Sequence, residues 1–219
     1  MTIRNKLLIS LGVLMVLGSF MTAGTLATFS AQTSNPSNVF GNGSMTMTNV
    51  AGTAVSGINC TTATTNGTCA TLFSSSTTGF QPGGADSSNT VTITYTGSIT
   101  TASFGLHAAN YTSESGGSAA SCTAADPASK LNLQIKQGST IVYPTSGSGY
   151  GSLSSFATTF SSNAALLHLD GGSNGAGTLD QWATSDSSVF TININLDTSA
   201  DNTYQGCQSQ TDFVWYAAQ

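Results

Sequence analysis

Few side chains in this sequence have the types and spacing needed for catalysis or metal binding. The two histidines, His107 and His168, lie in separate segments, and neither belongs to a His-Glu-x-x-His pair. That motif places two zinc ligands on one face of a helix, so its absence argues against a zinc protease. The sequence also lacks a Gly-x-Ser-x-Gly nucleophile elbow and the glycine patterns of phosphate-binding loops. We therefore predict that the protein is not an enzyme and has no catalytic or metal-binding residues.

One loop carries oxygen atoms that could bind calcium. Asp170 precedes the glycine-rich residues 171–175, and Asp180 follows them. The loop lacks the evenly spaced carboxylates and the closing Glu of an EF-hand. We therefore expect no cofactor, with calcium at this loop as the alternative.

The four cysteines predict two disulfides in an exported chain. Cys60 and Cys69 flank a short turn rich in Thr, Asn and Gly and could close it as a local loop. That arrangement leaves Cys122 to pair with Cys207, although four cysteines allow three pairings. Disulfides are typical of oxidising compartments, and no Cys-x-x-Cys spacing points to a metal site.

The amino terminus has the layout of a secretory signal. Arg4 and Lys6 precede an uncharged apolar run over residues 7–21. Such a run is short for crossing a bilayer and is typical of a signal peptide. A retained hydrophobic helix, as in a pilin, is the alternative interpretation of the same residues.

The cleavage site is predicted between Ala27 and Thr28. Thr25 and Ala27 are small residues at the spacing that signal peptidases require, and cleavage after Ala23 is the alternative. Residues 1–27 are then a signal peptide. We expect the remaining chain to be secreted, at the cell surface or in a biofilm matrix, and not to be held in a membrane.

Composition excludes several other classes of protein. The 219 residues include 4 basic and 9 acidic side chains, and beyond the signal only Lys130 and Lys136 are basic. Two lysines cannot neutralise a phosphate backbone, so we expect no nucleic-acid partner. The chain is 39% apolar, which argues against disorder. Its 24 glycines and its many Ser and Thr residues favour a β-rich extracellular domain.

Alternation of apolar and polar residues predicts strands rather than helices. In a half-buried antiparallel strand, every second side chain faces the core. The alternating segments are residues 45–48, 91–96, 131–136, 190–196 and 213–217. Residues 104–107, and residues 141–143 after the turn at Gln137-Gly138, are also predicted as strands.

Between these strands, the sequence predicts long loops and one short helix. Residues 74–89, 112–129, 145–152 and 170–178 are rich in Ser, Thr and Gly, and only residues 156–169 have a pattern that suits a helix. The fold class that follows is all-β, as a jelly-roll-like antiparallel sandwich with long loops.

Both ends of the chain resemble one known family. Residues 24–30 read Gly-Thr-Leu-Ala-Thr-Phe-Ser, and residues 202–206 and 212–219 read Asn-Thr-Tyr-Gln-Gly and Asp-Phe-Val-Trp-Tyr-Ala-Ala-Gln. A second block near the amino end matches at Asn38, Phe40 and Gly43. These motifs resemble the TasA/camelysin family of secreted, fibre-forming proteins, which includes archaeal bundling-pilus relatives. Four cysteines and so low a charge are departures from that family's pattern.

The resemblance implies a jelly-roll domain over residues 39–219 and an amino-terminal donor strand over residues 28–38. In donor-strand exchange, that segment leaves its own domain and pairs with a sheet edge of the next subunit. The segment that would do this begins with Thr28, Phe29, Ser30, Ala31 and Gln32. Phe29 and Ala31 alternate with polar residues, as a strand that places apolar side chains in pockets requires.

The expected function is that of a structural subunit in an extracellular filament, either a matrix fibre or a bundling pilus. Its main partner would be a second copy of itself in a head-to-tail homopolymer, with an accessory or anchor protein as a further partner. A secreted adhesion or carbohydrate-binding module is the alternative, in which Trp182, Trp215 and Tyr150 would stack on sugars. A pilin with a retained amino-terminal helix is the third interpretation.

Overall fold

The computed structural model describes residues 3–7, 43–51, 59–61, 69, 72–73, 80–114, 122–172 and 175–219. It divides into two units, residues 1–41 and 42–219, and each is described by itself. In the first unit, residues 3–7 form a short helix. Across the part of the chain that is described, no helix combines the length and the apolar character needed to cross a membrane.

Most of the predicted amino-terminal features lie outside the described residues. This holds for the predicted cleavage site, the donor strand and part of the block that follows it, namely Ala27, Thr28, Phe29, Ser30, Ala31, Gln32, Asn38 and Phe40. Gly43 is described, and a Cβ atom at this position would lie 2.0 Å from Ile99 Cγ1. The side chain of Ile99 therefore packs against the bare backbone where the chain enters the folded body.

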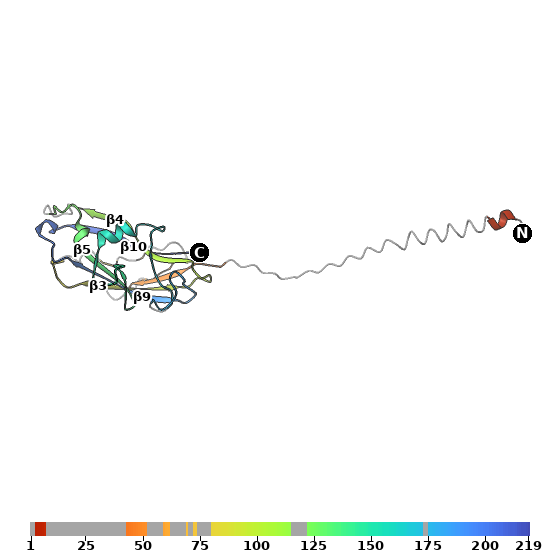
Figure 1. Ribbon diagram of the computed structural model, residues 1–219, viewed down its shortest axis with the longest axis horizontal. Helices are drawn as coiled ribbons and strands as arrows, with labels where there is room; N and C mark the ends of the chain where they lie inside the picture. Colours follow the sequence, from red (N-terminus) through yellow and green to blue (C-terminus); the bar gives the residue numbers. More distant parts are fainter. Residues whose placement is uncertain are drawn as a thin grey trace. The chain divides into compact units, whose positions relative to one another are not determined.

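The folded body consists of two antiparallel sheets, and Figure 1 shows their longest strands. The larger sheet has the strand order β2-β1-β3-β9-β5-β6, with β7 also pairing with β5, and the smaller sheet has the order β10-β4-β8. The strands are β1 (Met47–Ala51), β2 (Asn59–Thr61), β3 (Ser87–Tyr95), β4 (Ser103–Glu114), β5 (Leu131–Gln137), β6 (Thr140–Tyr143), β7 (Gly151–Ser152), β8 (Leu167–His168), β9 (Ser187–Leu196) and β10 (Gln208–Ala218). The all-β, antiparallel prediction is confirmed, whereas the jelly-roll topology stays a prediction.

Alternation places every second side chain of each central strand in the core. Val91, Ile93 and Tyr95 of β3 are fully buried, and Val91 lies opposite Phe190 of β9. On the other side of β9, Ile192 lies opposite Ile135 of β5. The predicted strands at these positions are confirmed, because a period of two puts every second side chain between the sheets.

The helix prediction is wrong in its position. A short helix was predicted within residues 156–169, whereas α2 spans Leu153–Thr159 and overlaps only residues 156–159 of that range. The Ser152 hydroxyl accepts a hydrogen bond from Ser155 N and thereby caps the helix, which begins directly after the predicted loop over residues 145–152. Phe156 of α2 is buried against Tyr143 and Phe160, which holds the short helix against the core.

A polar cluster around Asp126 joins three elements. Its carboxylate accepts hydrogen bonds from Ser113 Oγ of β4 at 2.7 Å, from Ser154 Oγ of α2 at 2.6 Å and from Tyr111 Oη at 3.1 Å. The 3-10 helix η1 (Pro127–Lys130) follows directly. Partial burial by itself would raise the pKa of Asp126, but the hydroxyl hydrogen bonds outweigh it, so the pKa lies below its ordinary value.

A disulfide holds the chain on both sides of this cluster. Cys122 and Cys207 are bonded at a sequence separation of 85, the long closure considered from the sequence. Cys207 directly precedes β10, so the bond anchors the start of that strand. Cys69 is also disulfide-bonded, whereas the side chain of Cys60, its expected partner, lies outside the described residues.

We expect the double variant Cys122→Ser/Cys207→Ser to lower the free energy of unfolding by about 4 kcal/mol, because the bond closes a long loop in the unfolded chain. Chemical denaturation followed by circular dichroism measures this loss. Cys60→Ser/Cys69→Ser is the matched control and should cost less, since the predicted loop is much shorter. An equal loss in both variants would contradict the loop-length argument.

We expect Asp126→Asn to be less stable than the wild type at neutral pH and to lose that deficit in acid. A carboxyl group with a lowered folded-state pKa stabilises the fold above its unfolded-state pKa, near 3.8. This contribution disappears as the pH falls through the folded-state value. Urea unfolding at pH 7 and pH 3 tests the sign, and a stability difference that does not narrow in acid would be inconsistent with it.

Candidate functional site: the edge strand β10

β10 is the outermost strand of the smaller sheet. It pairs with β4 from Gln208 to Ala218, with a bulge between Gln210 and Asp212. Among the residues that the structure describes, no strand pairs with its other side. An eleven-residue strand with one side unpaired is long for a sheet edge, and such edges recruit further strands.

The free main-chain groups of β10 belong to its apolar residues. Phe104 of β4 directs its N–H to Asp180 Oδ1 and its C=O to Leu169 N, both away from β10. In an antiparallel ladder, the residue opposite such a position also points its groups outward, and that residue is Ala217. Ala108 donates its N–H to Phe160 O in the same way, so the opposite residue, Phe213, points outward too.

Trp215 lies between Phe213 and Ala217 on β10, and by the same alternation its main-chain groups also point outward. The side chains of Phe213, Trp215 and Ala217 face the core but are only partly buried. The Trp215 ring lies 6.0 Å from the Phe190 ring of β9, and the Phe213 ring lies 5.7 Å from that of Phe156. Trp215 Nε1 is buried and has no hydrogen-bond acceptor in the described structure.

The larger sheet has more strands than the smaller sheet, and it extends past the smaller sheet on the side of β10. Next to β8, the C=O of Asp170 accepts a hydrogen bond from Gln137 Nε2 of β5, so the β8 side of the smaller sheet faces β5. Trp215 of β10 faces β9, and β3 and β1 lie beyond it in the larger sheet. A strand added to β10 would therefore extend the smaller sheet beneath β3 and β1.

Apart from the bulge between Gln210 and Asp212, β10 lacks the usual features that protect an edge strand. Proteins place lysine, proline or inward-facing charges on exposed edges to prevent pairing. The sequence of β10, Gln-Ser-Gln-Thr-Asp-Phe-Val-Trp-Tyr-Ala-Ala, has one charged residue, Asp212, which accepts a hydrogen bond from Asn110 Nδ2 at 2.7 Å. The half from Phe213 to Ala218 is uncharged, and it is the half whose apolar side chains are incompletely covered.

The histidines and acidic residues form no comparable site. His168 Nδ1 lies 2.7 Å from Asp180 Oδ1, and His107 is buried beside the carbonyl of Ala108. No group of three metal-binding side chains occurs within the described ranges. The calcium alternative stays a prediction, because residues 173 and 174 lie outside those ranges.

The residues proposed to stack on sugars do not form a binding surface. Trp182 is fully buried and stacks on Phe104 at 4.0 Å, so its assignment to a sugar site is wrong. Trp215 faces the core, and the Tyr150 hydroxyl donates to Asp86. Burial and that carboxylate raise the pKa of Tyr150 to about 12.

Sequence reasoning recognised the strand at residues 213–217 but did not recognise it as an assembly edge. Strand order is a property of the three-dimensional fold, and no local pattern reports it. The available signal was the lack of lysine and proline across residues 208–218, which is unusual for an edge strand.

The two tryptophans should differ in their access to solvent. With Trp182→Phe, the remaining Trp215 should be quenched by acrylamide in the monomer, because it is only partly buried. With Trp215→Phe, the remaining Trp182 should be protected, since it is fully buried. Equal quenching of the two variants would contradict the incomplete cover at β10.

No protein-family model matches the chain, and no curated protein matches it.

Proposed function

We propose that this protein is the structural subunit of an extracellular filament, in which residues 28–38 of one copy add a strand to β10 of the next. The observation that carries the proposal is the free edge of β10, where outward main-chain groups and half-buried apolar side chains coincide at Phe213, Trp215 and Ala217. The protein would be secreted, would bind copies of itself, and would contribute no catalytic activity.

Strand addition explains how such an edge gains both affinity and specificity. Main-chain hydrogen bonds supply affinity, and alternate side chains of the incoming strand occupy apolar contacts. Phe29 and Ala31 would lie on the core side beside Trp215, while Ser30 and Gln32 would face outward. The contact uses two different surfaces of the same chain, so it repeats without closing and produces a filament.

Removing the predicted donor strand should abolish filaments. We expect residues 28–219 to form filaments under negative-stain microscopy and residues 39–219 to stay monomeric while folded, because residues 42–219 form a compact unit by themselves. Filaments from the shortened chain would place the interface elsewhere in the body.

Phe29→Ala should weaken polymerisation without unfolding the monomer. Truncating a buried aromatic side chain costs about 3 kcal/mol, which corresponds to a critical concentration raised by about 100-fold. Sedimentation across a concentration series measures this value, and unchanged filament yield at low concentration would contradict the role of Phe29 as an anchor.

Ala217→Pro should block assembly at the accepting edge. Proline removes the outward N–H of Ala217 but leaves the hydrogen bonds to β4 in place, so the monomer should still fold. Tyr216→Ser is the matched control, because it changes a neighbouring side chain and keeps every main-chain donor. Equal polymerisation of Ala217→Pro and Tyr216→Ser would show that the filament does not use this edge.

A further inference from the structure

Gly43, where the described part of the folded body begins, lies at the same end of that body as the last residues of β10. Ser44 N donates to Ser98 Oγ at 2.9 Å, and Ser98 N donates to Ser44 O at 2.8 Å. In the same loop between β3 and β4, Ala102 N donates to Ala218 O at 2.8 Å. This loop therefore contacts both the start of the body and the last residues of β10.

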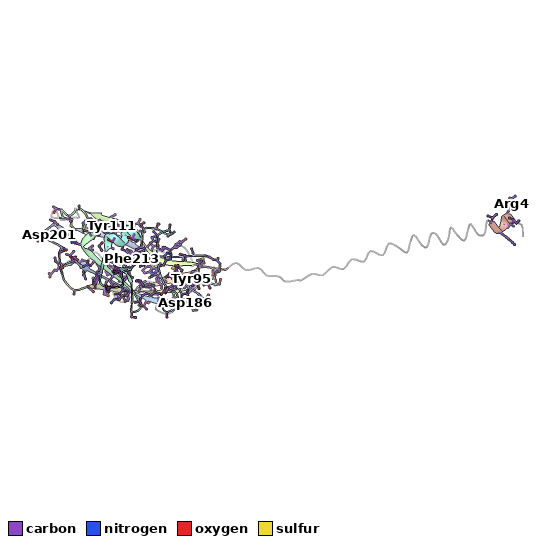
Figure 2. The ribbon with its side chains drawn as sticks, viewed as in Figure 1. Arg4, Tyr95, Tyr111, Asp186, Asp201 and Phe213 are labelled. Carbon is purple, nitrogen blue, oxygen red and sulfur yellow. A yellow bond between two sulfur atoms is a disulfide. The ribbon has the colours of Figure 1, made fainter. Side chains whose placement is uncertain are left out.

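The figures agree with this placement. Figure 1 shows the C-terminus and the orange strand β1 at one end of the body. Figure 2 shows Tyr95, which pairs with Met47 of β1, at that end and Asp201, shortly before β10, at the opposite end. β10 thus runs along the body toward the end at which Gly43 enters.

This placement determines the direction of the donor segment within one subunit. If residues 28–38 folded back along their own β10, the chain would run toward Gly43 and therefore toward Ala218. That direction is parallel to β10. Residues 39–42 could span roughly 13 Å, and stacked sheets lie about 10 Å apart, so connection length does not prevent self-pairing.

Pairing between subunits has the opposite direction. In a head-to-tail row of equally oriented subunits, the segment leaves one body at the Ala218 end and enters the next at its Gln208 end. Residue 38 then lies near Gln208 of the next subunit, and residue 28 lies near Ala218. The chain therefore runs antiparallel to the β10 that it contacts.

We propose that strand direction makes β10 select a second copy of the chain over its own amino-terminal segment. This inference rests on the proposed filament function and specifies how the partner binds. Antiparallel ladders are slightly more stable per residue than parallel ones. Every pair of named strands in both sheets is antiparallel, so the incoming strand continues the existing pattern.

The lengths of the two segments fit this arrangement. β10 has 11 residues, and the predicted donor strand, residues 28–38, is equally long. A full-length antiparallel match would place the Phe29 side of the donor against the uncharged half of β10, beside Trp215. A parallel match would instead place Phe29 near the polar half, which begins Gln-Ser-Gln.

Cross-linking of the assembled protein distinguishes the two directions. We would form filaments of residues 28–219 carrying Ser30→Cys with either Tyr216→Cys or Gln210→Cys and treat them with a short bismaleimide. No free cysteine occurs in the described structure, so the introduced thiols are the expected targets. We expect a ladder of covalent multimers from the Ser30/Tyr216 pair and none from the Ser30/Gln210 pair. Ser30→Cys alone is the control and should give no product larger than a dimer.

Each contrary result has a separate meaning. An intramolecular cross-link in the Ser30/Gln210 protein would show parallel self-pairing and overturn the inference. A multimer ladder from that protein would show parallel pairing between subunits, which overturns the direction but leaves the filament proposal standing. Filaments without any cross-link would exclude β10 as the accepting edge. Failure of the unmodified residues 28–219 to form filaments would overturn the proposed function itself.

Discussion

The side of β10 that no described strand pairs with is the constraint on which the rest of the structure depends. A backbone N–H or C=O group that loses water without gaining a hydrogen bond destabilises the protein, so a strand edge is either solvated or paired. β10 combines such an edge with Phe213, Trp215 and Ala217, whose apolar side chains are only partly covered. Water satisfies the main-chain groups but not the apolar surface. A further strand would satisfy both.

Contacts at both ends of β10 hold this strand in place without a further strand on its other side. The disulfide between Cys122 and Cys207 anchors its first residues, and Asp126 links Ser113 of β4 to Ser154 of α2. At the other end, Ala218 O accepts a hydrogen bond from Ala102 N. An edge held at both ends would lose less conformational entropy on pairing with a further strand.

The small number of charged side chains would also favour the pairing of β10 with a further strand. Beyond the predicted signal peptide, Lys130 and Lys136 are the basic residues of the sequence, and neither lies on β10. The hydroxyl and amide side chains that replace charge form hydrogen bonds between neighbouring strands, as between Thr94 and Ser187 or between Asn132 and Asn195. These contacts keep the outer face of the larger sheet polar.

Local patterns in the sequence determined the strands and their faces. The alternation at Phe190–Leu196 and Val91–Tyr95 follows from the period of two in a β-strand, so these elements and their buried rows could be predicted. The position of α2 was missed because Phe156 is held in the core by Tyr143 of β6 and Phe213 of β10, contacts that depend on the tertiary fold. Trp182 was misassigned for a related reason: its burial depends on stacking with Phe104. Only the tertiary structure decided that β10 is an edge strand and that the chain enters the body where β10 ends, since strand order is set by pairings between residues far apart in the sequence.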